Sequence, residues 1–177
     1  MKFKYLAASG LAGLALAAHA TTVTFADFSD PSSLTLNGNA AVVTSSDGKV
    51  LRLTSAGPSQ SGSGFGTQTI NAATFSTYFT FRITAPGGTV FDCNRVGGAD
   101  GLVFVVQNVS ASIGGAGQGI GYDGVGHSVG VEWDTWCNAG NNDPSSNHLG
   151  IDINGNVKHG GGSPNTLNVA NSFDDGS

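Results

Sequence analysis

The feature that most constrains the fold is a succession of short β-type segments separated by turn residues. No stretch places apolar residues at the i, i+3, i+4, i+7 spacing of an amphipathic helix, and the 28 glycines favour turns between strands. The clearest segment runs from Phe75 to Ile83, where every second residue is Phe, Thr or Ile, so it predicts a strand with one buried face. We therefore expect an all-β fold, with strands at residues 33–36, 40–44, 50–54, 64–70, 73–84, 101–107, 128–134 and 149–154.

The turns predict how these strands connect. Asn154-Gly155 is a favoured two-residue hairpin turn, and short strands joined by such turns are typical of a sandwich or a barrel. No linker or repeat divides the chain, so one domain is expected. Residues 160–177 are polar and rich in Gly, Asn and Asp, and we expect no strand there. Either the protein frays at this end or the sequence is the N-terminal part of a longer domain.

The N-terminus predicts export. Lys2 and Lys4 precede an apolar run from Tyr5 to Ala18, and Ala18-His19-Ala20 is a small-residue cleavage site, so residues 1–20 are interpreted as a signal peptide. A transmembrane helix is the alternative, but it needs about 20 strongly apolar residues and this run is shorter. We expect a mature protein that starts near Thr21, is secreted to an extracellular or periplasmic space, and has no membrane insertion.

The charge pattern and the cysteines limit the partners and the redox state. The net charge is −5 with only seven basic residues, two of them in the predicted signal, so there is no basic patch for nucleic acid or an anionic membrane. Cys93 and Cys137 form an even pair, and disulfides persist in exported proteins. Two free buried thiols are the alternative.

One run carries the candidate chemistry. On a strand, Glu132 and Asp134 point to the same face, about 6–7 Å apart along the backbone. Asn138, Asp143 and His148 follow at intervals that suit a loop folding back over the strand end. Oxygen ligands suit Ca²⁺, and an imidazole beside carboxylates suits a transition ion. A polar turn without ligands is the alternative, but Glu132 is the only Glu in the chain and it lies within this cluster.

The same run resembles a known family. Glu-Trp-Asp-Thr-Trp-Cys-Asn, four residues, Asp-Pro, three residues and His-Leu-Gly-Ile-Asp are similar, without a gap, to the metal-binding segment of legume-type (L-type) lectins. Ala99-Asp100-Gly101 before an apolar strand resembles a second family segment, and the Gly-rich stretch 114–122 resembles a third. Weaker likeness begins near Thr22.

The resemblance implies a fold. Residues 21–177 would form a concanavalin-like antiparallel β-sandwich (jelly roll). Late strands complete the back sheet of this family, so we expect the sandwich to be incomplete at its C-terminal end, with an unpaired edge or an exposed apolar patch. The expected core residues are Phe79, Phe81, Phe104, Val106 and Trp133.

The resemblance also implies a metal centre with a sugar site beside it. The transition ion, Mn²⁺ in the family, would be held by Glu132, Asp134, Asp143 and His148. Ca²⁺ would share Asp134 and Asp143 and take the Asn138 side-chain oxygen and the Trp136 carbonyl. Lys158 stands where family members typically have a Ser that supports the transition ion, about ten residues past the His, which puts Mn²⁺ occupancy in question.

Glycans or polysaccharides are the implied partners. Asp100, preceded in the family by a cis peptide, would accept hydrogen bonds from two sugar hydroxyls, and Asn138 would donate its amide. An N–H of the Gly117-Gln118-Gly119 loop would donate to the sugar, and the Trp136 ring would stack on it. If the loops meet as in the family, a Cys93–Cys137 disulfide would join the Asp100 loop to the metal loop.

Two other classes of protein fit the sequence less well. A glycoside hydrolase on a related sandwich has a Glu-x-Asp-x-Glu strand, but the third acid would fall at Trp136, so no second Glu can serve. A structural surface protein would not need the Asn138 and His148 spacing. We therefore expect a Ca²⁺-dependent lectin and not an enzyme. His127 and His159 lack ligand-type neighbours at suitable spacing and are expected at the surface.

Overall fold

The computed structural model describes residues 22–84, 91–95, 97–112, 114–160 and 166–170. This part of the chain contains eight β-strands and two short 3-10 helices, so the predicted all-β class is confirmed. None of its helices has the length and apolarity that a membrane crossing requires. The predicted signal peptide, residues 1–20, lies outside the described residues.

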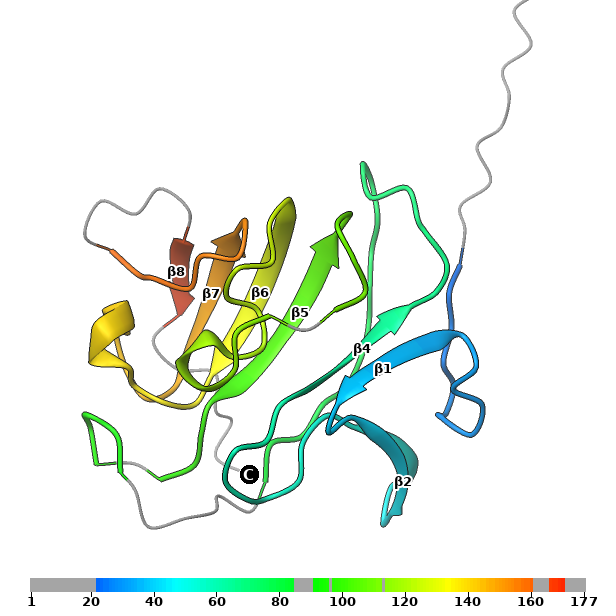
Figure 1. Cartoon of the computed structure of the whole chain (residues 1–177), viewed down its shortest axis with the longest axis horizontal. Helices are drawn as coiled ribbons and strands as arrows, with labels where there is room; N and C mark the ends of the chain where they lie inside the picture. The colour runs from blue at the N-terminus through cyan, green and yellow to red at the C-terminus, as the bar shows by residue number, and fades with distance from the viewer. Residues whose placement is uncertain (1–21, 85–90, 96, 113, 161–165, 171–177) are drawn as a thin grey trace, which may run out of the picture.

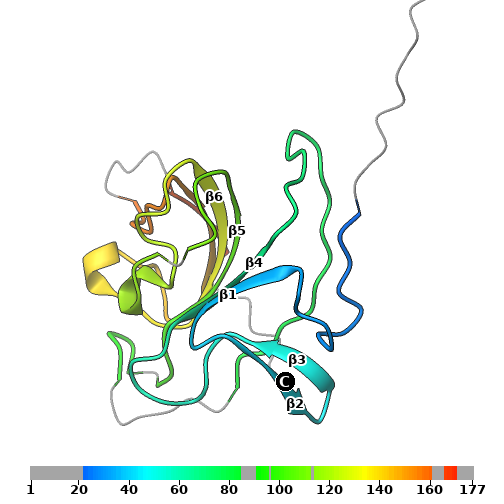
Figure 2. The ribbon, with the colours of Figure 1, turned by 45° about the vertical axis from the view of Figure 1, so that its right-hand side comes forward.

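The strands form antiparallel sheets (Figures 1 and 2). The largest sheet has the order β5-β6-β7-β8, with β5 at Gly101–Gln107, β6 at Ser128–Asp134, β7 at His148–Ile153 and β8 at Thr166–Ala170. Two smaller pairs lie beside it, β1 (Leu34–Gly38) with β4 (Gly62–Gly66), and β2 (Ala41–Ser45) with β3 (Gly48–Arg52). The 3-10 helices η1 (Gly117–Gly119) and η2 (Ala139–Asn141) lie in the loops around β6.

The two faces of β6 and β7 differ in an unusual way. Side chains alternate between the faces of a strand, and here the polar set is the buried one. The buried positions are Ser128, Gly130, Glu132, Asp134, His148, Gly150 and Asp152, whereas the apolar residues between them are half-buried or exposed. Burying so many polar groups is costly unless each has a partner, so this face is a candidate for function.

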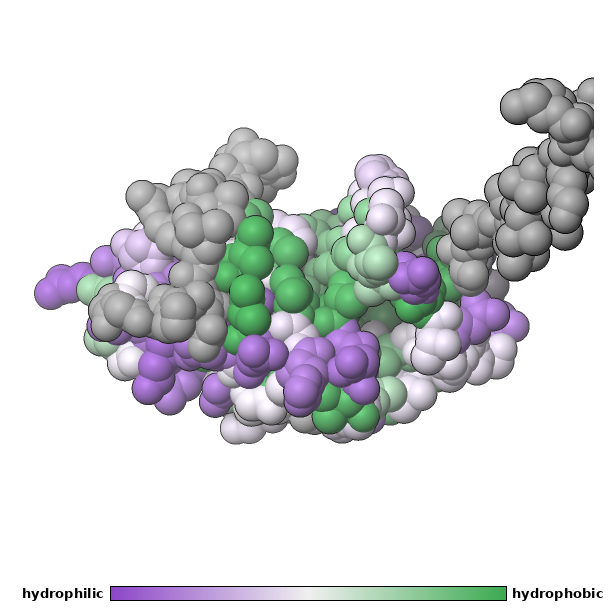
Figure 3. All heavy atoms as spheres, turned by 90° about the horizontal axis from the view of Figure 1, so that it is seen from above, coloured by the Kyte–Doolittle hydropathy of each residue, from purple (hydrophilic) through white to green (hydrophobic). Residues whose placement is uncertain are grey.

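The opposite face holds the expected core residues, but they are less buried than predicted. The Phe79 ring stacks on Phe104 with centroids 5.5 Å apart, and Phe81 lies 5.1 Å from Trp133. Phe79 and Phe81 are nevertheless 40% and 41% exposed, and Phe104, Val106 and Trp133 are half-buried. The cluster therefore forms, but no described element covers it. The expected exposed apolar patch is present, and Figure 3 shows hydrophobic side chains gathered across the middle of the molecule.

Two predictions about strands were wrong. Residues 73–84 form no strand, because among the described residues no strand hydrogen-bonds to them, and the alternating apolar side chains of Phe75 and Ile83 stay exposed. A strand, β8, was not expected in the polar tail, yet it pairs with β7 through a bulge at Leu149/Gly150. Its alternation of Leu167 and Val169 with Thr166 and Asn168 is only five residues long, so the polar composition of the tail concealed it.

The hairpin turn at Asn154-Gly155 is confirmed. Both residues have positive φ, 58° and 71°, as a type I′ turn requires. Ile153 and Asn156 pair across it. The turn reverses the chain after β7, and the Asn154 N–H donates to the Ser128 carbonyl of β6 at 2.9 Å.

Candidate metal and carbohydrate site

The register of β6 and β7 builds the centre of the site. Asp134 pairs with His148, and Glu132 pairs with Gly150. Directly opposed residues project to the same face, so Glu132, Asp134 and His148 share the buried polar face. Their exposed fractions are 1%, 2% and 0%. Strand register alone therefore brings two carboxylates and an imidazole together.

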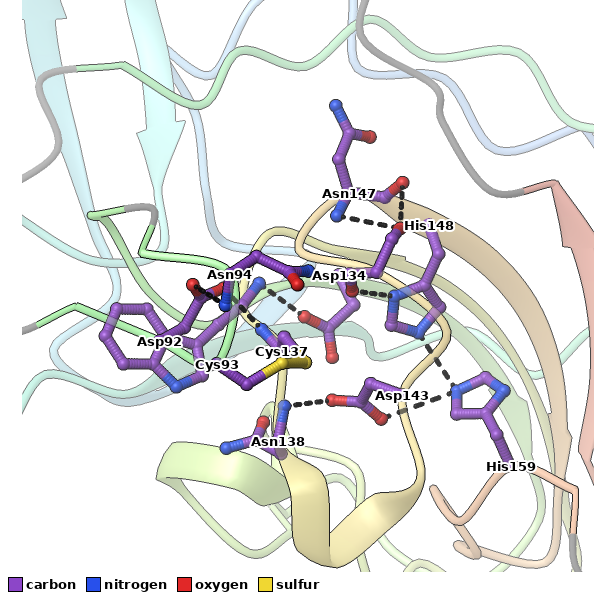
Figure 4. The surroundings of a disulfide bond; sticks show 12 residues. Asp92, Cys93, Asn94, Asp134, Cys137, Asn138, Asp143, Asn147, His148 and His159 are labelled. Carbon is purple, nitrogen blue, oxygen red and sulfur yellow. Dashed lines mark hydrogen bonds and ion pairs between the residues drawn. A yellow bond between two sulfur atoms is a disulfide. The ribbon is translucent and has the colours of Figure 1, made fainter.

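The loop after β6 folds back over this strand end, as the spacing predicted. The Trp136 N–H donates to Asp134 Oδ1 at 2.7 Å, and the Asn138 N–H donates to Asp143 Oδ2 at 2.6 Å (Figure 4). The turn of η2 lies between Asn138 and Asp143. Each carboxylate therefore orients a backbone group of the loop as well as facing the cluster.

His159 joins the cluster, and the prediction that it lies at the surface was wrong. It is 4% exposed, and its Nε2 lies 2.7 Å from Glu132 Oε1 and 3.0 Å from His148 Nε2. Its backbone N–H donates to the Asn141 carbonyl at 2.7 Å, which fixes the segment after the turn against η2. The turn at residues 154–155 was the one signal that could have placed it here. His127 is exposed, as expected.

The cluster is electrostatically crowded. Burial raises the pKa of the Asp134 carboxyl, and the negative charge of Asp143 acts in the same direction. Burial raises the pKa of Asp143 as well. For Glu132, burial alone would raise the pKa, but hydrogen bonds from His148 and His159 outweigh it and the pKa is lowered. A bound divalent cation would offset the repulsion between these buried carboxylates.

Two groups of side chains have metal-binding geometry. Glu132, His148 and His159 form one, and Asp134, Asp143 and His148 form the other, with all ligand atoms of each group within 4.8 Å of one another. In addition to these groups, Asn138 offers its Oδ1, and this oxygen and Asp143 Oδ1 are buried and accept no hydrogen bond from the described residues. Unsatisfied buried oxygens are expected where an ion completes the coordination, so the donor set fits a Ca²⁺ beside a transition ion.

The predicted sugar-binding residues border this cluster from three loops. The peptide between Ala99 and Asp100 is cis, as the resemblance implied. The Asp100 carbonyl accepts a hydrogen bond from the Thr135 N–H at 2.9 Å, which places the Asp100 loop beside the metal loop. Asp100 is half-buried, and burial raises the pKa of its carboxyl.

The glycine-rich loop is tied to the same place. Asn141 Nδ2 donates to the Gln118 carbonyl at 2.8 Å, which joins η2 to η1. Gly117 and Gln118 are exposed and Gly119 is buried. Trp136 and Asn138 are half-buried in the loop between β6 and η2. The structure thus gathers the Asp100, Gly117–Gly119 and Trp136–Asn138 segments at one end of the large sheet.

A disulfide joins two of these loops. Cys93 and Cys137 are bonded, with Cα atoms 5.6 Å apart, so the prediction of a disulfide is confirmed. The Cys137 N–H also donates to Asp92 Oδ2 at 2.9 Å. Figure 4 shows the bond beside Asn138 and Asp143.

Comparison with known proteins identifies the family. The family model described as the legume lectin domain matches residues 20–161, which is most of the chain. The chain belongs to the legume lectin family. Its antiparallel sheets are those of the concanavalin-like β-sandwich that this membership implies.

Several curated relatives of this lectin domain are similar over part of their length. A galactose-binding lectin of Arachis hypogaea is 39% identical over 48% of this chain and 30% of its own. The leucoagglutinating phytohemagglutinin of Phaseolus vulgaris is 40% identical over 46% and 29%. An L-type lectin-domain containing receptor kinase VIII.1 of Arabidopsis thaliana is 37% identical over 54% and 13%. The matched segments span less than a third of each relative.

This lectin domain departs from the family pattern after β7. Lys158 stands where a supporting Ser was expected, but its side chain is exposed and does not face the cluster. His159, one residue later, is buried there instead. Of these two neighbouring side chains, only that of His159 therefore lies in the cluster.

Proposed function

We propose that this protein is a secreted lectin that binds carbohydrate only when Ca²⁺ is bound. The observation that carries the proposal is the Asn138 side chain, whose Oδ1 is buried beside the carboxylates of Asp134 and Asp143 and has no hydrogen-bond partner among the described residues. An amide oxygen left unsatisfied costs about 1–3 kcal/mol, and a Ca²⁺ ligand position accounts for it.

The chain supplies the ligands for two ions. Asp134, Asp143, the Asn138 Oδ1 and the Trp136 carbonyl would hold Ca²⁺, and Glu132, Asp134, Asp143 and His148 would hold Mn²⁺ or another transition ion. Bound ions supply positive charge that neutralises the buried carboxylates and fixes the loop. The hydrogen bond between the Trp136 N–H and Asp134 Oδ1 (2.7 Å) supports this arrangement, because it already holds the Trp136 peptide at the bridging carboxylate.

The sugar would then meet groups from three loops. With its oxygen turned to Ca²⁺, the Asn138 amide has its NH₂ free to donate to a sugar hydroxyl. Asp100 would accept from two hydroxyls, and the Trp136 ring would stack on an apolar sugar face. The Gly119 N–H already donates to the Ala116 carbonyl at 3.3 Å, so the donor to the sugar would be the N–H of Gly117 or Gln118.

The family supports sugar binding in preference to catalysis. One relative is named for galactose binding and another as an agglutinin. Hydrolysis of a glycosidic bond needs two carboxyl groups that reach the substrate. The only glutamate, Glu132, is fully buried and lies against two imidazoles, so it cannot contact a sugar. Together with membership of the lectin family, this favours a non-catalytic binding protein.

Export is part of the proposal. Residues 1–20 have the pattern of a signal peptide. The Cys93–Cys137 bond supports an oxidising compartment. N-terminal sequencing of the exported protein should give Thr21 as the first residue, and a retained Met1 would contradict this.

A glycan array tests the binding function. The protein labelled and applied in Ca²⁺ should bind a defined set of glycans, and the Asn138→Leu variant should lose all of them while remaining folded by circular dichroism. Replacement of exposed Asn108, which follows β5, by Leu serves as the matched control and should keep the binding. Equal binding by Asn138→Leu would overturn the proposal.

A further inference from the structure

His159 places a second imidazole at the transition-ion position. Its Nε2 lies 2.7 Å from Glu132 Oε1, 3.0 Å from His148 Nε2 and 3.9 Å from Asp143 Oδ1. The two imidazole rings meet edge to face, with centroids 4.6 Å apart. The Nε2 atoms of His148 and His159 lie 3.5 Å and 2.7 Å from Glu132 Oε1, and Figure 4 shows the two rings approaching each other through these nitrogens.

The hydrogen bond at Nδ1 of His148 fixes the tautomer that suits its inward nitrogen to metal binding. His148 Nδ1 lies 3.0 Å from the Ser145 carbonyl, which can only accept, so Nδ1 carries the hydrogen. In the neutral ring, Nε2 then has its lone pair directed at His159 and Glu132. Metal-binding histidines are oriented in this manner, with the outer nitrogen donating to a carbonyl.

Gly150 provides the space in which the two side chains meet. A Cβ at this position would collide with Glu132 Oε1 and would lie 3.1 Å from His159 Cε1. Glycine is therefore needed on β7 opposite Glu132 for the carboxylate and the imidazole to share the site. Glu132, His148 and His159 therefore converge because all three side chains are buried and Gly150 of β7 leaves space for them.

The second imidazole changes the chemistry of the site. Carboxylate-rich sets suit Mn²⁺, whereas imidazoles favour Zn²⁺, Co²⁺, Ni²⁺ and Cu²⁺, and stability rises along the series from Mn²⁺. Two histidines and a glutamate are also a ligand set that zinc takes readily. We propose that His159 is a direct ligand of the transition ion and that it makes the site selective for Zn²⁺ over Mn²⁺. The inference rests on the metal centre of the proposed function but not on sugar binding.

Metal competition tests the selectivity. Purified protein, stripped with EDTA, is dialysed against equal concentrations of Zn²⁺ and Mn²⁺ in excess Ca²⁺, and the retained ions are measured by mass spectrometry. The protein should retain Zn²⁺ over Mn²⁺ by at least ~10-fold, and His159→Ser should reduce Zn²⁺ affinity by about 10–100-fold. Exposed His127, changed to Ser, is the matched control and should retain the preference. A Mn²⁺ preference in the unaltered protein, or unchanged Zn²⁺ affinity in His159→Ser, would overturn the inference.

A second measurement needs no variant. In ¹⁵N spectra of the imidazole rings, one equivalent of Zn²⁺ should shift the signals of both His148 and His159, and movement of a single ring would overturn the inference. Failure of this inference can be distinguished from failure of the proposed function. A protein that binds glycans equally well with Mn²⁺ and shows no Zn²⁺ preference loses only this inference. A protein that prefers Zn²⁺ but binds no glycan in Ca²⁺ loses only the sugar-binding proposal.

Discussion

Asp134 and His148 are direct partners in the register of β6 and β7, and both side chains are buried on the same face of the sheet. The strand pairing that builds the fold therefore also places a carboxylate beside an imidazole. Asp134 additionally accepts the Trp136 N–H. It links the sheet, the metal-binding loop and the proposed bridging position, so its removal should have wide effects.

Replacing Asp134 with Asn should abolish metal binding and sugar binding together. The amide keeps the shape of the side chain and an oxygen that can accept the Trp136 N–H, but it removes the charge that would bridge two ions. Without the ions the metal-binding loop is no longer held in place. Calorimetric titration with Ca²⁺, followed by glycan, measures both losses. Asp47→Asn, which alters an exposed carboxylate, is the control. Glycan binding that survives without Ca²⁺ binding would contradict this prediction.

Asp100→Asn should separate the two activities. The variant loses the carboxylate proposed to accept two hydroxyls, and each such charge-assisted hydrogen bond contributes about 1.5–3 kcal/mol, so sugar affinity should fall by more than ~100-fold. Ca²⁺ affinity should change little, because Asp100 is not among the proposed ligands. The thermal stabilisation by saturating Ca²⁺ should therefore persist. A variant that loses this stabilisation would show that Asp100 acts through the metal.

Replacing Cys93 and Cys137 by Ser should destabilise the protein. The bond closes 44 residues, and loop-closure entropy for that length predicts a loss of about 4 kcal/mol, within the common range of native disulfides. Urea unfolding of the double variant and of the unaltered protein gives the difference. Because the bond joins the Asp100 side of the site to the metal loop, Ca²⁺ should also bind more weakly. Equal unfolding midpoints would contradict the structural role.

Gly150→Ala should weaken the transition-ion site by crowding. The new Cβ meets Glu132 Oε1 and His159 Cε1, and overpacking of this kind costs about 1–3 kcal/mol. Gly126→Ala is a matched control, because a Cβ there meets nothing within 4 Å. Thermal unfolding with and without Zn²⁺ should show a smaller metal-induced shift only in Gly150→Ala. An identical shift in both variants would argue against the packing described for Glu132 and His159.

Much of the site could be predicted from the sequence because its residues lie close together in the chain. The β-type segments expected at residues 101–107 and 128–134 have the observed bounds of β5 and β6, and the spacing after Asp134 predicted the returning loop that Asn138 and Asp143 form. His159 was missed because its role depends on the hairpin turn, which changes which residue faces inward. The residues next to His159 in the sequence do not indicate that its side chain faces the buried cluster.

The prediction of a strand at residues 73–84 was wrong for a different reason. Alternation predicts a face suited to burial, but a strand also needs a hydrogen-bonding neighbour, and none of the described strands pairs with it. Phe79 and Phe81 still pack on Phe104 and Trp133, so the apolar signal was correct about which side chains meet. β8 is the reverse case, since Leu167 and Val169 alternate with polar residues over only five positions, and the polar composition of the surrounding tail outweighed this signal although the segment pairs with β7.

The most direct test of the account is calorimetry of sugar binding with and without Ca²⁺. The strongest glycan from the array is titrated into Ca²⁺-loaded protein, into protein stripped with EDTA, and into stripped protein to which Ca²⁺ is returned. We predict binding in the first and third titrations and none in the second, because Asn138, Trp136 and Asp100 need the ion to be held in place. Undiminished binding in EDTA would contradict the central claim even though the chain has the fold of its family.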